Sequence, residues 1–212
     1  MLMRLLLVCL MLPLALAGCG ADHIYASDAQ IAKYRYVSDE PPSMTLFTVI
    51  GATSGAGGHS ALMVNGRERI IFDPAGTWNH PWAPERNDVH YGITEKMRKF
   101  YIDYHSRKSW YVRTQKVPIT MAQADQLMAR VESNGSVGKM LCADSVSSVL
   151  RDMPWLKGKF SFTFSPLKLS RQFGELPGVV TKEIHDNDPD DNSGVLMIQQ
   201  PKPKQVTPMG GY

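Results

Sequence analysis

The stretch from His59 to Asp73 constrains the fold most, because it holds two strand-like runs joined at Asn65-Gly66. Apolar residues dominate "HSALMV" before this dipeptide and "RIIF" after it. Asn-Gly between apolar runs is a strong hairpin signal, since both residues tolerate the positive φ angles of a tight turn. The sequence therefore predicts an antiparallel pair of strands over residues 59–65 and 68–73.

The surrounding residues predict further strands and separate helices. "TLFTVIG" at 45–51 is apolar and β-branched, which is typical of a strand. Thr94 can cap one helix, and Thr120 with Gln123 forms a capping-box pattern at the start of another. A third helical pattern contains Cys142. Strands followed by helices indicate an α+β domain with a central antiparallel sheet, and 212 residues suit one such domain.

The N-terminus has the layout of an export signal. Arg4 precedes an apolar run over 5–16, and small residues follow it. The end of the run, "LAGC", resembles the lipobox of bacterial lipoproteins. This resemblance implies that a signal peptide over 1–18 is removed and that Cys19 carries fatty acyl chains such as palmitate. The alternative is an ordinary signal with an incidental cysteine.

The lipoprotein resemblance implies a protein that is anchored to a membrane of the cell envelope. Gly20, in the position after the acylated cysteine, favours the outer membrane of a diderm cell, with the protein facing the periplasm. We expect residues 19–44 to be a tether and lead-in, and residues 45–180 to form the domain. The acidic and then proline-rich residues 181–212 have the composition of a disordered tail.

Cys142 is the one cysteine that remains if Cys9 is removed and Cys19 is acylated. Helical spacing places it on one inward face with Val146 and Leu150. A helix N-terminus and a nearby histidine both favour a thiolate. The alternative is a structural cysteine, because unpaired cysteines are often buried in cores.

His59 and Asp73 could assist such a thiol as base and orienting carboxylate. A tight turn centred on Asn65-Gly66 would pair residue 59 with about residue 72 on the opposite strand. This pairing would place Asp73 close to His59. The alternatives are a structural histidine at a strand edge and an aspartate that closes a turn before Pro74.

The pattern "GHSALMV…ERIIFDPAG", followed by "LCADSVSSVL", resembles the permuted branch of the NlpC/P60 papain-like cysteine hydrolases. In that branch the histidine strand comes first, then a polar residue on the next strand, then the cysteine at a helix N-terminus. The resemblance implies Cys142 as nucleophile, His59 as base and Asp73 as its partner. It also implies amide or ester substrates, such as peptidoglycan peptides or acylated lipids. The alternative is a structural or binding lipoprotein that keeps the fold without turnover.

Two regions are expected to line the substrate groove. Gly57 and Gly58 precede His59 and allow close approach of a substrate backbone. The long loop over 77–92 carries Trp78, Trp82 and Tyr91, which suit a lid or a groove wall.

The sequence does not favour a metal, a cofactor or nucleic acid. His80, Asp88 and His90 lack the tight spacing of metal ligands. The net charge of +3 comes without a dense basic stripe. We therefore expect the membrane and the substrate to be the partners.

Overall fold

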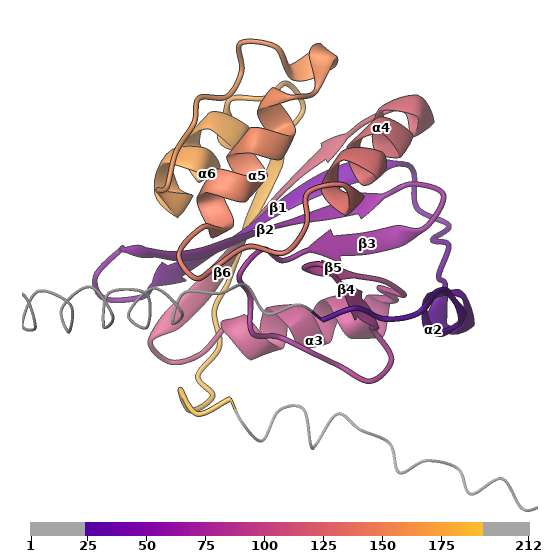
Figure 1. The fold of residues 1–212 in the computed structure, drawn as a ribbon. Helices are drawn as coiled ribbons and strands as arrows, with labels where there is room; N and C mark the ends of the chain where they lie inside the picture. The colour runs from indigo at the N-terminus through magenta and orange to yellow at the C-terminus, as the bar shows by residue number, and fades with distance from the viewer. Residues whose placement is uncertain (1–23, 193–212) are drawn as a thin grey trace, which may run out of the picture.

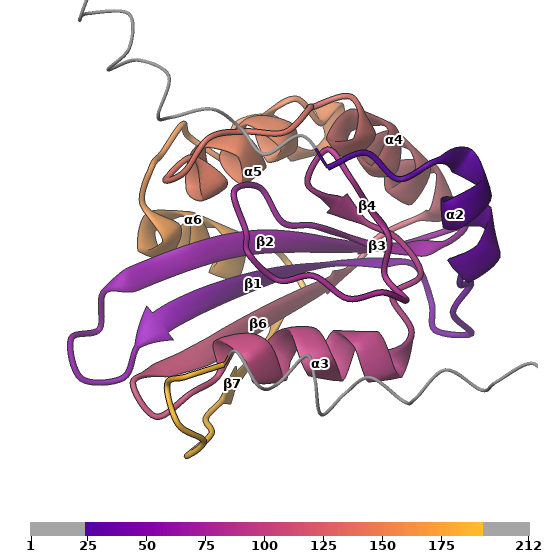
Figure 2. The same cartoon turned by 60° about the horizontal axis from the view of Figure 1, so that its bottom comes forward.

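The computed structural model describes residues 24–192. Its centre is a seven-stranded sheet in the order β4-β5-β3-β2-β1-β6-β7, and all its paired strands are antiparallel. Figure 1 shows α4, α5 and α6 above the sheet and α3 below it, and Figure 2 shows the same layers from another side. The predicted α+β class with a central antiparallel sheet is confirmed.

The strands are β1 (Ser43–Gly51), β2 (Gly57–Asn65), β3 (Arg69–Phe72), β4 (Glu85–Arg86), β5 (Val89–His90), β6 (Trp110–Pro118) and β7 (Val180–Ile184). The helices are α2 (Asp28–Tyr34), α3 (Glu95–His105), α4 (Met121–Glu132), α5 (Cys142–Arg151) and α6 (Pro166–Gly174), with a short 3₁₀ helix η2 (Pro154–Leu156). None of these helices is long and apolar enough to span a bilayer.

Because successive side chains of β2 point to opposite faces of the sheet, the strand contributes to two hydrophobic cores, one on each face. Leu62 and Val64 pack into the larger core, under α4, α5 and α6. Ala61 and Met63 point the other way and pack into the smaller core under α3. His59 continues this second series, so its side chain belongs on the α3 side of the sheet.

The β2–β3 hairpin forms, but its register differs from the expected one. Asn65 pairs with Arg69, and Gly66 donates a hydrogen bond from its N–H to the Glu68 carbonyl oxygen at 3.0 Å. The connection thus contains three residues, 66–68, and Leu62 lies opposite Phe72. The expected pairing of residue 59 with about residue 72 is wrong, because the longer turn slides β3 along β2.

The predicted helix starts are confirmed. The Thr94 side chain accepts a hydrogen bond from the Met97 N–H, and Thr120 and Gln123 form a complete capping box. Cys142 is the first residue of α5. The inward face of α5 is confirmed, and the burial extends to Ala143 and Ser147 because the helix is covered on several sides.

Both ends of the described chain are more ordered than expected. The lead-in contains α2, which Ser27 and Gln30 cap reciprocally. Residues 181–184, which we expected to be part of a disordered tail, belong to β7 on the edge of β6. The polar composition of this segment predicted disorder, but the edge of β6 provides backbone hydrogen-bond partners that order it as a strand. The side chains of β7 remain largely exposed. The signal peptide, Cys19 and residues 193–212 lie outside the described residues.

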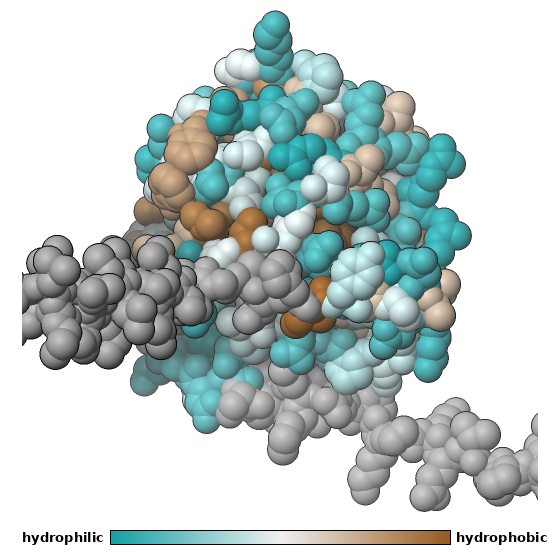
Figure 3. All heavy atoms as spheres, viewed as in Figure 1, coloured by the Kyte–Doolittle hydropathy of each residue, from teal (hydrophilic) through white to brown (hydrophobic). Residues whose placement is uncertain are grey.

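The face drawn in Figure 3 is mainly hydrophilic, with apolar residues between the polar ones. Phe162 and Phe164 are about half exposed, and their rings contact each other edge to face at 4.9 Å between centroids. Met140, two residues before Cys142, is the most exposed large apolar residue in the described range, at 85%.

Candidate active site

Cys142 lies where β3 leaves the edge of β2 free. Within residues 24–192, the β3 ladder covers only Leu62 to Asn65 of β2, so the earlier half of β2 extends beyond it. Helix α5 packs on β2, as Figure 1 shows. Its first residue therefore reaches the strand next to His59 and Ser60.

Cys142 is buried, with 7% of the residue exposed, and the surroundings of its thiol favour the thiolate. Burial acts to raise the pKa of the thiol, but hydrogen bonding and charge from His59 outweigh it and lower the pKa from its usual value. The backbone N–H groups of Ser60 and Ala143 act in the same direction. The first turn of a helix adds a partial positive charge at the sulfur.

His59 and Asp73 form a short ion pair behind the thiol. His59 Nε2 lies 2.6 Å from Asp73 Oδ1. Burial is the largest single influence and lowers the pKa of His59, but the charges and hydrogen bonds of Asp73 and Cys142 together outweigh it and raise the pKa to about 10. Conversely, burial raises the pKa of Asp73, but the charge and hydrogen bond of His59, with smaller effects of His105 and His90, together bring it well below its usual range. Because Nε2 is engaged by Asp73, the other ring nitrogen, Nδ1, is the one left for the thiol.

The structure brings Cys142, His59 and Asp73 together, although the register that we expected for the β2–β3 hairpin was wrong. Continuing the β2–β3 pairing puts residue 73 opposite Ala61, two residues from His59 on the same face of the sheet. This diagonal separation is within reach of two long side chains. The Asp73 carboxylate does not close the turn, whose hydrogen bond runs from the Gly76 N–H to the Asp73 carbonyl oxygen at 2.9 Å.

Tyr101 is a site residue that sequence reasoning missed. Its hydroxyl donates to Asp73 Oδ1 at 2.7 Å, so this oxygen accepts from both His59 and Tyr101. Tyr101 projects from α3 and is fully buried. A usable signal existed, because Tyr101 and His105 are four residues apart and share one face of a capped helix.

Two further histidines surround the pair. The His105 ring lies parallel to the His59 ring at 5.6 Å between centroids. His90 Nε2 lies 3.9 Å from Asp73 Oδ2, and burial lowers the pKa of His90. Neutral His90 and His105 leave the positive charge beside Asp73 on His59.

The expected groove residues separate into two groups. Gly58 lies under the Trp110 ring, whose nearest atom would be 2.7 Å from a Cβ at this position. A Cβ at Gly57 would be 3.0 Å from Pro166 of α6. Trp78 and Tyr91 are core residues, at 1% and 5% exposure. Tyr91 is wrong as a groove residue, because it packs in the larger core and donates its hydroxyl to Glu132.

Two hollows flank the site and share Thr77 as a common wall. The larger, about 540 Å³, lies between residues 75–79 and the loop before α5, where Val137 and Lys139 line it; Trp78 also reaches it. The smaller, about 220 Å³, contains the His59 side chain itself together with Gly58. Trp82 lines neither hollow.

The Asp88 carboxylate connects the loop after Asp73 with the loop before Cys142. Its Oδ2 accepts from the Ala75 N–H at 3.2 Å and from the Val137 N–H at 3.0 Å. The first of these belongs to the turn after Asp73, and the second to the loop before Cys142. Asp88 therefore has a structural role, because it holds these two backbone segments together.

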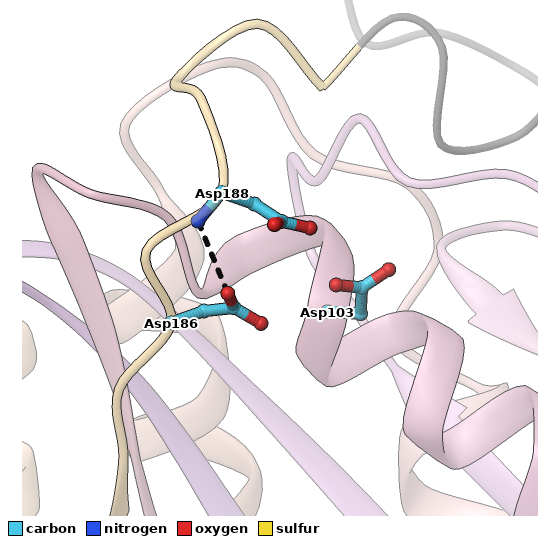
Figure 4. A group of neighbouring side chains, drawn as sticks. All are labelled: Asp103, Asp186 and Asp188. Atoms are coloured by element: carbon cyan, nitrogen blue, oxygen red, sulfur yellow. Dashed lines mark hydrogen bonds between the residues drawn. The ribbon is translucent and has the colours of Figure 1, made fainter.

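An acidic cluster lies near the C-terminal end of α3. Figure 4 shows Asp103 on α3 facing Asp186 and Asp188 from the segment after β7, with one potential ligand atom from each within 4.8 Å of the others. Arg107 lies 3.3 Å from Asp103 and 3.3 Å from Asp188. The cluster therefore binds the Arg107 guanidinium, and these contacts attach the C-terminal segment to α3.

The site consists of a thiol, an imidazole and a carboxylate in series, a set that can perform nucleophilic catalysis on a carbonyl. Its residues come from β2, the turn after β3, and α5, with support from α3. We compared the chain with protein-family models, curated proteins and solved structures, and none of them matches it.

Proposed function

We propose that the chain is a thiol hydrolase or acyl-transfer enzyme of the permuted NlpC/P60 type. The observation that supports it best is the coupling of Cys142 to His59 and of His59 to Asp73, which favours a thiolate beside an imidazolium. The chain order, histidine strand, carboxylate, then cysteine helix, agrees with that of the permuted branch.

The first chemical step is acylation of Cys142. The thiolate attacks the carbonyl carbon of an amide or ester and forms a C–S bond. The His59 imidazolium gives its proton to the leaving nitrogen or oxygen as that bond breaks, which yields a thioester and a neutral imidazole. Asp73 stabilises the imidazolium and holds the ring in place.

The second step transfers the acyl group. Neutral His59 takes a proton from water, or from another nucleophile, as it attacks the thioester carbonyl. The C–S bond then breaks, and the thiolate and imidazolium are restored. The N–H of Cys142 can stabilise the oxyanion in both steps, because the first N–H groups of a helix have no intrahelical acceptor.

We also propose that the enzyme is a lipoprotein of the cell envelope, held by acyl chains on Cys19 and facing the periplasm from the outer membrane. The support is the "LAGC" pattern after the apolar run. Two or more acyl chains give stable anchoring, at roughly 0.8 kcal/mol per buried CH₂. Peptidoglycan peptides and acylated lipids are the substrates that such a location offers.

Trapping the acyl-enzyme tests the proposal. The folded protein is incubated with a panel of activated acyl esters and amides, and the Cys142 peptide is analysed by mass spectrometry. We expect an acyl adduct that Cys142→Ser abolishes and His59→Ala strongly reduces. His185→Ala is the matched control, because the His185 side chain is exposed and its ring stacks on Tyr111 of β6. A folded protein without any adduct would favour the non-catalytic binding role.

A further inference from the structure

His105 presents a second imidazole to the hollow that contains His59. Its ring is parallel to that of His59, with 6° between the planes. Both rings line the hollow of about 220 Å³, whose other walls include the Tyr104 and Trp110 rings. The mechanism above uses only one of these two imidazoles.

The hydrogen bonding of His105 determines which of its nitrogens carries the proton. Nδ1 lies 2.8 Å from the carbonyl oxygen of Tyr101, one turn earlier in α3. A carbonyl oxygen only accepts hydrogen bonds, so Nδ1 must be the protonated nitrogen. In the neutral ring Nε2 therefore carries a lone pair and acts as an acceptor.

The ring is neutral under ordinary conditions. Burial lowers the pKa of His105 and the nearby positive charge of His59 lowers it further, so that despite Asp73 the pKa falls to about 4. Within residues 24–192 no group donates a hydrogen bond to Nε2. Because Nδ1 faces its own helix, Nε2 is on the opposite side of the ring, away from the helix backbone.

We propose that His105 Nε2 accepts a hydrogen bond from the N–H of the scissile amide, and that the enzyme consequently prefers amides to matched esters. This inference rests on the proposed hydrolase function. The leaving nitrogen of an amide has its own hydrogen for His105, while His59 supplies the additional proton that the departing amine needs. An ester oxygen has no hydrogen to donate, so it leaves the lone pair of Nε2 without a partner.

The preference follows from the cost of unpaired polar groups. A site built to accept a hydrogen bond discriminates against an analogue that lacks the donor, because the acceptor is then desolvated without compensation. The parallel stack holds the acceptor beside the catalytic ring, and the bond to Tyr101 keeps the ring from rotating. A single neutral hydrogen bond of this kind corresponds to a preference of roughly tenfold.

The test compares kcat/KM for acyl anilides with that for phenyl esters of the same acyl groups, after correction for the leaving-group reactivity seen with hydroxide. His105→Phe keeps a stacked ring and removes the acceptor. We expect it to lower kcat/KM for the anilides by roughly tenfold and to cause no loss for the esters, because the acceptor that they leave unpaired is removed. His105→Gln, whose side-chain oxygen can replace the lone pair, should restore part of the anilide activity. His185→Phe is the control for the same substitution at an exposed position.

Each outcome bears on one claim. Equal losses for anilides and esters in His105→Phe, or no loss for either, would overturn the role of His105 while the acyl adduct on Cys142 keeps the hydrolase proposal intact. A wild-type protein that forms no adduct and cleaves neither class would overturn both.

Discussion

The α-carbon of Gly76 lies against the carboxylate of Asp73. A Cβ at position 76 would be 1.9 Å from Asp73 Oδ2, far closer than van der Waals contact allows. Only glycine therefore permits the turn after β3 to wrap the carboxylate that binds His59. This contact links a loop residue to the proposed chemistry.

Replacing Gly76 by alanine should displace Asp73 and separate it from His59. We expect kcat/KM to fall at least tenfold and the free energy of unfolding to fall by about 1–3 kcal/mol, as for other overpacked sites. Gly178→Ala is the control, because its positive φ of 74° makes alanine strained there although the added Cβ meets no atom within 4 Å. Should both variants lose activity equally, the contact with Asp73 is not the cause.

The second prediction concerns the pH at which Cys142 reacts. In the wild type the thiol pKa is lowered, so alkylation by a small haloacetamide should reach half its maximal rate below the usual thiol pKa of about 8.5. In His59→Ala, burial and the backbone N–H groups are the influences that remain on the pKa of the thiol. Because burial is the largest influence and raises the pKa of the thiol, the profile should move to higher pH.

Rates of alkylation between pH 5 and pH 10 measure this shift, with unfolded protein as the reference for a free thiol. Asp73→Asn should move the profile in the same direction by a smaller amount, since the imidazolium loses its partner but the ring stays. Superimposable profiles for the wild type and His59→Ala would show that the imidazole does not act on the thiol.

The third prediction is that Tyr101 supports Asp73 mainly through stability. Tyr101→Phe removes a buried hydrogen bond to a carboxylate, which is worth about 1.5–3 kcal/mol. His59 still binds the same oxygen, so activity should fall less than in Asp73→Asn. Denaturant unfolding and kcat/KM measure the two effects. Tyr104→Phe is the control, because its hydroxyl bonds to Thr77 at an exposed position; an equal loss of stability there would contradict the special role of Tyr101.

The sequence predicts the strands and helix starts well because these depend on local signals. The Thr94 and Thr120 caps act within one turn, and the apolar alternation of β2 appears in its own residues. The hairpin register was not predictable in this way. Asn65-Gly66 favours a tight turn, but the length of the turn also depends on where Arg69 finds its partners across β2.

The missing parts of the site depend on contacts between distant segments. Tyr101 and His105 reach Asp73 and His59 because α3 packs under the sheet, which the spacing within α3 does not specify. Tyr91 looked like a groove residue because it lies in a long loop. The loop folds inward there and buries the ring in the larger core, since burial of large aromatic surfaces stabilises an otherwise irregular segment, whereas Trp78 is buried but still lines the larger hollow.

The fourth prediction concerns Cys19, which lies outside the described residues. If "LAGC" directs acylation, the mature protein should begin at Cys19 and carry fatty acyl chains on it. Mass spectrometry of the N-terminal peptide from membrane fractions measures this. Cys19→Ser should abolish the modification and release the protein from the membrane, and an unmodified Cys19 in the wild type would contradict the lipoprotein proposal.

The last prediction concerns the segment after β7, whose acidic composition is that of a disordered tail. Asp190 accepts from the N–H and the hydroxyl of Ser109, at 2.8 and 2.7 Å. The Asp188 carboxylate lies 3.3 Å from the buried guanidinium of Arg107. Removing residues 185–212 would leave Arg107 with Asp103 alone, and a buried charge that loses a partner is destabilising.

We therefore expect a chain that ends at Ile184 to melt several degrees below the full chain, and a chain that ends at Asn192 to melt at the same temperature. The shorter chain should also bind substrate less well, because Asn192 lines the hollow beside His59 and donates to the Tyr104 carbonyl oxygen at 3.2 Å. Calorimetry and KM measure the two effects separately. If both truncated chains match the full chain in melting temperature and in KM, the contacts of residues 185–192 contribute neither to stability nor to the site.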